Sequence, residues 1–501
     1  MSDPIPVDVL VVGGGINGVG IARDAAGRGL SVLLVERGDL ACGTSSASSK
    51  LVHGGLRYLE QYQFRLVRES LAEREVLLAA APHLIWPLRF VLPLHAGLRP
   101  EWLLRLGLLL YDHIGGRETL PATRTVRRGS DPELAPLKQS YRRGFEYSDC
   151  WADAARLVVA HAMDARNRGA RIEVGWALTA AARAAGLWKV ELASASGETR
   201  SVRARALVNA AGPWVEAVLK STGAARHSTL RLVKGSHIVV PRLYPQAQAY
   251  TLQSGDGRVV FIVPYENDFS LIGTTDIPFS GDPARLSAGA DEITYLCGVV
   301  SDYLQAPVAP VDVVWSYAGV RPLYDDGRQS ASTVTRDYAF DLDLKPGGAP
   351  LLSVFGGKLT TYRKLAEHAL SELLPQLGSK APSWTRGAIL PGGDLPGKDY
   401  DAFSADQVAC HPALPAALVR RLCRAYGTRI ERILGTVATP DRLGEQIAPD
   451  LYEAELEYLC DQEWTRTAED ALWRRSKLGL KFNAAQAARV AAWFGVRRTQ
   501  R

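Results

Sequence analysis

The sequence predicts an α/β fold that opens with a strand–helix–strand unit, continues into an antiparallel sheet and ends in helices. Two apolar segments typical of strands, Val7–Val12 and Ser31–Val35, flank a predicted helix over Ile16–Arg28. The stretch from Leu230 to Thr275 is rich in β-branched and aromatic residues, as expected of antiparallel strands. From Val408 onward the hydrophobic pattern is almost entirely helical.

Length and composition fit a globular protein of several domains. The 501 residues suffice for two to four domains, and a hydrophobic content of 47% supports a large core. The 59 Lys and Arg residues against 53 Asp and Glu residues give a net charge of +6, which suits anionic substrates or an anionic membrane surface. This excess is too diffuse for a nucleic-acid-binding surface, and no nucleic-acid partner is expected.

The cysteines and the N-terminal residues indicate the compartment. Six cysteines are scattered without a CxxC pair, so neither a metal site nor a redox disulfide is expected. The first residues lack a basic-then-apolar signal region, and no apolar run reaches the roughly 20 residues of a spanning helix. We therefore expect a cytoplasmic protein.

A glycine-rich motif connects the first predicted strand to the first predicted helix. Gly13 permits a tight turn, Gly15 allows the backbone to approach a pyrophosphate, and Gly18 allows helix and strand to pack closely. The helix N-terminus offers N–H groups and a partial positive charge to phosphates. Glu36 ends the second strand, where its carboxylate can accept hydrogen bonds from ribose hydroxyls. The motif predicts a Rossmann-like dinucleotide-binding domain.

Two later segments favour FAD over NAD as the dinucleotide. Residues 206–214 form an apolar strand that runs into a small-residue turn at Gly212, and such strands return to the nucleotide in many two-domain flavoproteins. Residues 353–361 form a strand followed by Gly356 and Gly357, which open a helix whose N-terminus can stabilise negative charge on a reduced flavin. An ordinary strand–turn–helix connection is the alternative for each segment.

Long motifs along the chain point to one family. The first is Thr44-Ser-Ser-Ala-Ser-Ser-Lys50-Leu-Val-His53-Gly-Gly-Leu-Arg57-Tyr58, and further motifs occupy residues 144–151, 234–240, 272–276, 317–323, 335–338, 356–364 and 469–477. Together they resemble FAD-dependent, quinone-linked glycerol-3-phosphate dehydrogenases, most of all the bacterial, membrane-associated aerobic branch. The resemblance spans nearly the whole chain. It implies that sn-glycerol 3-phosphate is oxidised to dihydroxyacetone phosphate by hydride transfer to FAD, and that ubiquinone or menaquinone receives the electrons.

The resemblance and the patterns together divide the chain into three domains. The α/β class then comprises a Rossmann-like FAD-binding domain, an antiparallel-sheet substrate cap and an all-helical C-terminal domain. The FAD-binding domain is expected from residues 1–75, 146–220 and 337–380, the cap from 76–145 and 221–336, and the helical domain from 390–501. The oligomeric state stays open, with a homodimer as one option.

Candidate site residues come from the same motifs. Arg321 and Arg336 are suited to bidentate contacts with a phosphate, and Lys358 can hold the substrate oxygen. Arg57 and Tyr58 follow a Gly-Gly turn and can reach the same pocket. The alternative for each basic residue is a solvated surface charge.

The remaining candidates are a proton acceptor and the ligands of FAD. His237 and His53 can accept the hydroxyl proton because imidazole titrates near neutrality, so the candidate catalytic residues are His237, His53, Lys358 and Arg321. A structural role is the alternative for each histidine. The candidate FAD ligands are Gly13, Gly15, Asn17, Gly18, Glu36, Thr44, Ser45, Ser46, Ser49, Lys50, Gly212, Gly357, Lys358, Leu359 and Thr360.

A leucine-rich helix predicted over Leu98–Tyr111 raises the question of a membrane. Its arginines and the nearby Arg117 suit lipid headgroups, while Trp102, Tyr111 and the leucines suit the interface. A buried core helix is the alternative. The resemblance favours a peripheral contact with the inner face of the cytoplasmic membrane.

Three other functions are compatible with the motifs. An oxygen-using glycerophosphate oxidase would share the reductive half of the reaction. An amino-acid oxidase of the same fold would bind a carboxylate where a phosphate is expected. A peripheral membrane protein would carry FAD only as a structural group.

Overall fold

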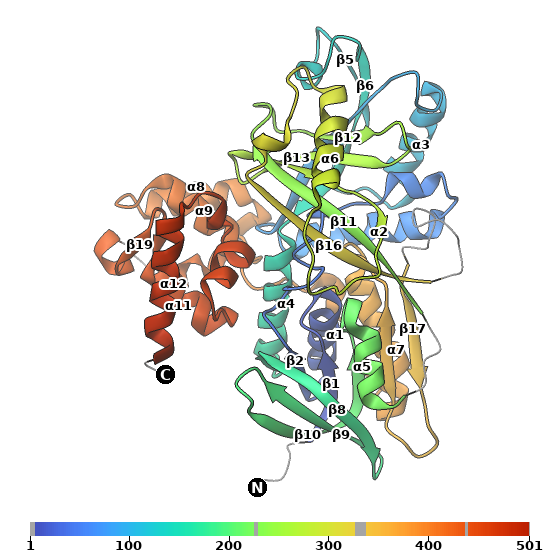
Figure 1. The fold of residues 1–501 in the computed structure, drawn as a ribbon, viewed down its shortest axis with the longest axis vertical. Helices are drawn as coiled ribbons and strands as arrows, with labels where there is room; N and C mark the ends of the chain where they lie inside the picture. The colour runs from blue at the N-terminus through green and yellow to red at the C-terminus, as the bar shows by residue number, and fades with distance from the viewer. Residues whose placement is uncertain (1–5, 225–228, 326–336, 436–438, 500–501) are drawn as a thin grey trace.

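The computed structural model describes residues 6–224, 229–325, 337–435 and 439–499. The fold has three parts (Figure 1). An α/β part occupies the lower half of the view in Figure 1, and a part built around a large antiparallel sheet lies above it. A lobe made of the C-terminal helices stands beside both.

The α/β part is centred on a sheet with the strand order β17-β18-β10-β1-β2-β7. β18, β10, β1, β2 and β7 run parallel, β17 is antiparallel to β18, and the hairpin β8–β9 continues from β10. The strands are β1 (Pro6–Val12), β2 (Val32–Glu36), β7 (Arg171–Val174), β8 (Trp176–Ala184), β9 (Leu187–Ser194), β10 (Thr199–Asn209), β17 (Ala339–Asp343) and β18 (Leu351–Phe355).

Both faces of this parallel sheet are buried. Successive residues of a strand point to opposite faces, so Val9 and Val11 pack beneath the helices α1 (Ile16–Gly27), α4 (Ala154–Asn167) and α7 (Tyr362–Leu377). Leu10 and Val12 point the other way, toward the β8–β9 hairpin and α5 (Val215–Thr222). The continuous apolar sequence of β1 is thus that of a strand covered on both sides.

The second sheet, which we call the antiparallel sheet, has the order β15-β11-β14-β13-β12-β4-β6-β3, with β16 paired to β11 and β5 to β6. One contact within it, between β4 and β12, is parallel. Its strands are β3 (Leu51–Val52), β4 (Ile85–Pro93), β5 (Arg124–Arg127), β6 (Arg143–Ala152), β11 (Leu230–Pro241), β12 (Ala249–Gln253), β13 (Val259–Tyr265), β14 (Phe269–Gly273), β15 (Ile277–Pro278) and β16 (Trp315–Tyr324).

Helices cover both faces of the antiparallel sheet. α6 (Ala290–Tyr303) packs on one face, while α2 (Phe64–Ala80) and α3 (Glu101–Ile114) pack on the other. The strands β3 and β6 lie in this sheet, although the ranges expected for the FAD-binding domain include residues 51–52 and 146–152.

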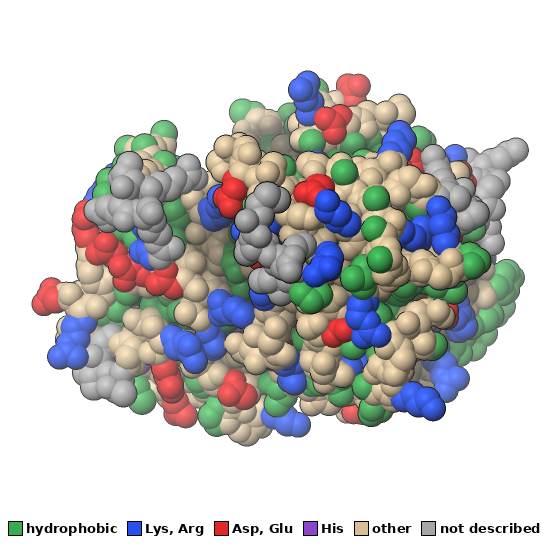
Figure 2. Space-filling view, turned by 90° about the horizontal axis from the view of Figure 1, so that it is seen from below, with side chains coloured by type: hydrophobic (Ala, Val, Ile, Leu, Met, Phe, Trp, Pro, Cys, Tyr) green, Lys and Arg blue, Asp and Glu red, His purple; other side chains and the backbone are tan. Residues whose placement is uncertain are grey.

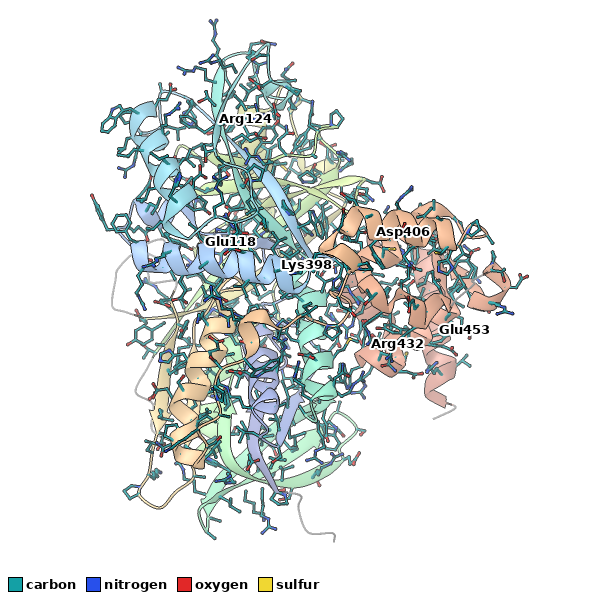
Figure 3. The ribbon with its side chains drawn as sticks, turned by 180° about the vertical axis from the view of Figure 1, so that it is seen from behind. Glu118, Arg124, Lys398, Asp406, Arg432 and Glu453 are labelled. Atoms are coloured by element: carbon teal, nitrogen blue, oxygen red, sulfur yellow. The ribbon has the colours of Figure 1, made fainter. Side chains whose placement is uncertain are left out.

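The C-terminal lobe is helical, as the sequence predicts, and one short hairpin is added to it. Its elements are α8 (Tyr400–Cys410), α9 (Ala416–Tyr426), α10 (Glu431–Leu434), β19 (Gln446–Ala448), β20 (Leu451–Tyr452), α11 (Glu453–Glu463), the π-helix η9 (Asp470–Arg475) and α12 (Ala484–Thr499). Figure 3 shows Lys398 where the chain enters the lobe, and Asp406, Arg432 and Glu453 within it.

The predicted elements agree closely with those observed. α1 begins at the predicted residue, Ile16, and ends one residue earlier than predicted. α3 begins after Pro100, three residues later than predicted, because Pro100 lies at its N-cap. In the described ranges no helix is long and apolar enough to cross a membrane.

Charged side chains of both signs are distributed over the surface seen in Figure 2. Lys and Arg residues are interspersed with Asp and Glu residues on that face, and no broad patch carries a single sign. This distribution agrees with the small net charge of the chain.

Candidate active site

A cavity of about 320 Å³ lies at the carboxyl ends of β1, β10 and β18. This edge of a parallel sheet is where α/β folds bind nucleotides. Its walls come from segments far apart in the sequence: residues 12–17, 35–37, 42–48, 176–178, 210–221 and 356–359, with Pro322. We call it the nucleotide cavity.

The glycine motif forms one end of the nucleotide cavity. Gly13 has a φ of +115°, a conformation that side-chain-bearing residues rarely adopt. A Cβ at Gly18 would lie 1.9 Å from the carbonyl oxygen of Gly13, so the turn and α1 meet only because Gly18 lacks a side chain. Gly18 supports the turn and does not itself line the cavity.

Glu36 anchors the adjacent wall. Its Oε2 accepts a hydrogen bond from the Gly14 N–H at 2.7 Å, and its Oε1 accepts one from the Gly38 N–H at 2.8 Å. The Ile16 N–H donates to Ser45 Oγ at 3.0 Å, which ties the segment after Glu36 to the first turn of α1. These contacts preorganise the cavity before any ligand binds.

The opposite end of the cavity is formed by Gly356 and Gly357, which both have positive φ. Asn17 Nδ2 donates to the Gly356 carbonyl at 3.2 Å and so joins α1 to this turn. Asn17 Oδ1 is buried without a hydrogen-bond partner among the described residues, and Asn17 lines the cavity. A bound group with a hydroxyl or N–H donor would satisfy this oxygen, as the ribityl chain and the flavin ring of FAD can.

A second cavity of about 470 Å³ lies on the other side of the same wall, and we call it the substrate cavity. Arg321 of β16 lines the substrate cavity, whereas the next residue, Pro322, lines the nucleotide cavity. Likewise, Ser49 lines the substrate cavity and Ser48 lines the nucleotide cavity. The two cavities therefore adjoin along residues 48–49 and 321–322.

Basic and aromatic side chains lie where the two cavities meet. Lys358 lines the nucleotide cavity, and its Nζ lies 3.9 Å from the centre of the Tyr58 ring, which lines the substrate cavity beside Arg57. Arg321 Nη1 donates to Asp276, and its Nη2 donates to Thr274 Oγ1 at 3.1 Å.

Five N–H donors belong to each guanidinium, so Arg321 can keep its contact with Asp276 and also bind a phosphate. Of the predicted phosphate ligands, Arg336 lies outside the described residues.

The structure separates the two candidate histidines. His53 lines the substrate cavity, and burial lowers its pKa below 6.5 with a further contribution from Lys358. His237 is 2% exposed and lines neither cavity. Its Nε2 lies 2.9 Å from Ser49 Oγ and its ring stacks on Tyr317, while burial lowers its pKa well below 6.5. Both imidazoles are neutral near pH 7, and only His53 faces the space available to a substrate.

Besides Gly18, four predicted FAD ligands lie behind the walls of the nucleotide cavity or on their far side. Ser46 donates to the Gly43 carbonyl, and Lys50 is buried with its Nζ 3.0 Å from the Ser46 carbonyl oxygen. Thr360 Oγ1 bonds the backbone of His53, and Ser49 faces the substrate cavity. The predicted ligands that do line the nucleotide cavity are Gly13, Gly15, Asn17, Glu36, Thr44, Ser45, Gly212, Gly357, Lys358 and Leu359.

Some wall residues are not among the predicted FAD ligands. Arg37 stacks over Trp214 at 4.1 Å, and both line the nucleotide cavity together with Trp176. Trp176 begins an ordinary strand, so only the tertiary structure brings it to the site.

Asp149 lines the substrate cavity and accepts hydrogen bonds from residues around it. It accepts hydrogen bonds from Arg74 at 2.8 Å and from the Tyr111 hydroxyl at 2.8 Å. The Gly54 N–H donates to the Tyr111 oxygen at 2.8 Å and thereby fixes the Gly54–Gly55 turn that precedes Arg57. The sequence places Asp149 in a family motif but gives no indication of this role.

The fold and the cavity at the ends of its parallel strands are those of a dinucleotide-binding protein, and the family match makes it a flavin-dependent oxidoreductase. Residues 8–363 match the family model for FAD dependent oxidoreductases, and residues 383–494 match that for the C-terminal domain of alpha-glycerophosphate oxidase. The chain belongs to this family of FAD dependent oxidoreductases, and its cofactor is FAD.

Relatives and solved structures resemble the chain over nearly its full length. It is 51% identical over 499 residues to the D-erythritol 1-phosphate dehydrogenase of Brucella abortus, covering 99% of each chain. It is 51% identical over 489 residues to the aerobic glycerol-3-phosphate dehydrogenase of Escherichia coli, covering 97% of each. The FAD complex of the Bacillus halodurans glycerol-3-phosphate dehydrogenase superimposes with a TM-score of 0.77 at 27% identity, covering 98% of this chain and 90% of that one.

Proposed function

We propose that the enzyme oxidises sn-glycerol 3-phosphate to dihydroxyacetone phosphate and passes the electrons to a membrane quinone. The observation that carries this proposal is the position of Arg321 and Arg57 in a cavity that adjoins the nucleotide cavity, with Lys358 of the nucleotide cavity in contact with Tyr58 at the junction. A phosphate bound there would bring the rest of a three-carbon substrate to the shared wall. The names of the relatives support the same substrate.

The residues of the chain have distinct roles in this proposal. Arg321 and Arg57 bind the phosphate, and Lys358 orients the reacting oxygen. His53, neutral near pH 7, accepts the hydroxyl proton as the C–H bond is cleaved. FAD, when bound, supplies the hydride acceptor. Phe261 and Leu104 line the substrate cavity and limit the access of water to the reacting carbon.

A four-carbon substrate is the second candidate. The similarity to a D-erythritol 1-phosphate dehydrogenase is as high as that to a glycerol-3-phosphate dehydrogenase, and covers 99% of the chain. The substrate cavity of about 470 Å³ has room for one more hydroxymethylene group, and Thr251 and Gln253 offer it hydrogen-bonding partners.

Anaerobic bleaching of the bound flavin distinguishes these substrates. We expect sn-glycerol 3-phosphate to bleach the flavin rapidly, D-erythritol 1-phosphate to do so more slowly, and glycerol hardly at all. Faster bleaching by the four-carbon phosphate would favour the second candidate. No bleaching by either phosphate would contradict both, and bleaching by an amino acid alone would indicate an amino-acid oxidase.

The electron acceptor is tested in the second half of the reaction. We propose that quinone-dependent turnover is far faster than production of hydrogen peroxide. The reverse ratio would identify a glycerophosphate oxidase with the same reductive half.

The membrane contact is proposed on the outer face of α3. Trp102, Leu106 and Leu109 are 68%, 54% and 56% exposed, an unusual density of large apolar side chains on one helix face. The expectation that Tyr111 enters the interface is wrong, because Tyr111 is 2% exposed and bonds Asp149. Leu108 is 1% exposed and also belongs to the core. α3 therefore combines a core face with an exposed apolar face, and the latter is the proposed contact with the cytoplasmic membrane.

A further inference from the structure

The C-terminal lobe reaches the FAD-binding part through two adjacent arginines. Arg475 Nη1 and Nη2 donate to the two carboxylate oxygens of Asp39 at 2.9 and 2.8 Å, and Arg474 Nε donates to Asp39 Oδ2 at 2.7 Å. The Arg475 side chain is fully buried and that of Asp39 is 6% exposed. Removing either partner of such a buried bidentate pair leaves the other charge buried and uncompensated, which is strongly destabilising.

Asp39 lies in the loop that forms one wall of the nucleotide cavity. Glu36 and Arg37 line the cavity just before Asp39, and residues 42–45 line it just after. Between them, the Ala41 N–H donates to the Gly14 carbonyl at 3.0 Å, and Ala41 has a φ of +63°. A non-glycine residue adopts this conformation only where its surroundings require it, so contacts outside the loop determine its shape.

The two arginines are themselves held rigidly. Arg475 Nη2 also donates to the Glu463 carbonyl at 2.8 Å, and the Glu463 carboxylate accepts hydrogen bonds from Arg156 of α4 at 2.7 and 2.8 Å. Arg474 and Arg475 end the π-helix η9, and such helices are frequent at functional sites. On the same segment, Trp473 stacks on Trp315, the first residue of β16, with ring centres 4.6 Å apart.

We propose that Arg474 and Arg475 are positioning residues for FAD. By binding Asp39 they hold residues 37–45 in the shape that receives the nucleotide, so the C-terminal lobe completes the cofactor site without touching the cofactor. Because coupling between two sites is reciprocal, bound FAD also stabilises the lobe at residues 470–476. This role of the two arginines in FAD binding does not depend on which substrate the enzyme oxidises.

Release of FAD from diluted holoenzyme, followed by flavin fluorescence, tests the proposal. Asp39→Asn and Arg475→Met should each release FAD about tenfold faster than the unmodified protein, because loss of one partner breaks the buried pair and lets the loop leave the shape that holds the nucleotide. Arg475→Lys should give an intermediate rate, because an ammonium keeps the charge but cannot bind both carboxylate oxygens.

Arg421→Met is the matched control. Arg421 forms an equally close bidentate pair with Glu455, at 2.8 and 2.6 Å, but inside the lobe and away from the loop. It should lower the thermal stability of the protein and leave the rate of FAD release unchanged. Equal acceleration of release in Arg421→Met and Arg475→Met would overturn the proposal, because general destabilisation would then explain both.

A second measurement keeps the proposal testable if the buried variants fail to fold. Arg474→Met removes a partner whose side chain is 13% exposed, so folding is expected, with a smaller acceleration of release. In the unmodified protein, addition of FAD to the apoprotein should slow amide hydrogen exchange at residues 470–476. Exchange there that is indifferent to FAD would refute the coupling.

Discussion

The ammonium nitrogen of Lys358 lies 3.9 Å from the centre of the Tyr58 ring, and the two residues line different cavities. This cation–π contact closes the junction at which the nucleotide and the substrate meet. In the proposed reaction, this position puts a positive charge beside the oxygen that loses its proton during oxidation.

Replacement of Lys358 by Met should therefore impair the chemistry. We expect kcat/KM for sn-glycerol 3-phosphate to fall by about 10²- to 10³-fold, the scale for removing one preorganised electrostatic contact at a reacting oxygen. Tyr58→Phe retains the ring face and should cost much less. Stopped-flow flavin reduction measures both, and equal losses in the two variants would show that the charge of Lys358 is not the important feature.

Arg321 should account for the discrimination between the phosphate and the free polyol. Arg321→Met should lower kcat/KM for the phosphate substrate by the equivalent of about 2–5 kcal/mol, because the bound phosphate would be enclosed without its cationic partner. The exposed Arg285 is a control, since Arg285→Met removes the same charge away from the cavity. An unmodified enzyme that oxidised glycerol as well as its phosphate would contradict the phosphate-binding role.

FAD should be bound non-covalently. Cys42 is an exposed residue that lines the nucleotide cavity, where the neighbouring wall atoms displace water from its thiol and, together with the carboxylates of Glu36 and Asp39, raise the pKa of that thiol. The thiol is therefore protonated near pH 7 and a poor nucleophile. Acid precipitation should leave the yellow colour in the supernatant for both the unmodified protein and Cys42→Ser. Colour retained in the pellet of the unmodified protein alone would identify a covalent link.

Buried neutral histidines should make the fold sensitive to acid. Burial lowers the pKa of His161 and of His83 from 6.5 to about 3. Between these values the unfolded chain binds protons that the folded one does not, so the stabilising effect present above pH 6.5 is lost as pH falls toward 3. Each such group contributes a slope of about 1.4 kcal/mol per pH unit.

Chemical unfolding at pH 7 and at pH 5 measures this slope. His161→Gln should reduce the difference between the two, although it weakens the 2.7 Å contact with the Tyr362 hydroxyl and lowers stability at pH 7. If His161→Gln left this difference unchanged, His161 would be protonated at pH 5 in the folded state as it is in the unfolded chain.

The two faces of α3 should respond differently to substitution. Replacing Trp102, Leu106 and Leu109 with Gln should release the protein from vesicles containing anionic lipid, while activity with a water-soluble electron acceptor persists. Leu108→Ala should instead lower the free energy of unfolding by about 2–5 kcal/mol, since Leu108 is 1% exposed in the core. An unmodified protein that never sediments with vesicles would end the membrane proposal.

Much of the fold follows from local sequence. Some features act over only a few residues, so their sequence patterns predict structure directly. Examples are the turn at Gly13 and Gly18, the acidic end of β2 at Glu36 and the apolar sequence of β18. The cofactor class follows from the same short segments. The family motifs extend this to the candidate substrate ligands Arg321 and Lys358.

Tertiary packing decides which side chain in a motif reaches the site. The sequence offers both His237 and His53 as candidate bases, yet only His53 lines the substrate cavity, because β11 directs His237 against Tyr317 and Ser49. Lys50 belongs to the same motif as Ser45, but it points beneath the loop and contacts the Ser46 carbonyl.

The sequence alone determined the α/β class, the dinucleotide motif and most of the helices and strands, because hydrophobic period and glycine geometry are short-range properties. The tertiary structure alone decided that Leu108 and Tyr111 face the core and that Arg475 meets Asp39 across 436 residues of chain. Such pairings depend on how complete layers pack against one another. No local pattern records them, since each partner is an ordinary charged or apolar residue until the fold brings the two together.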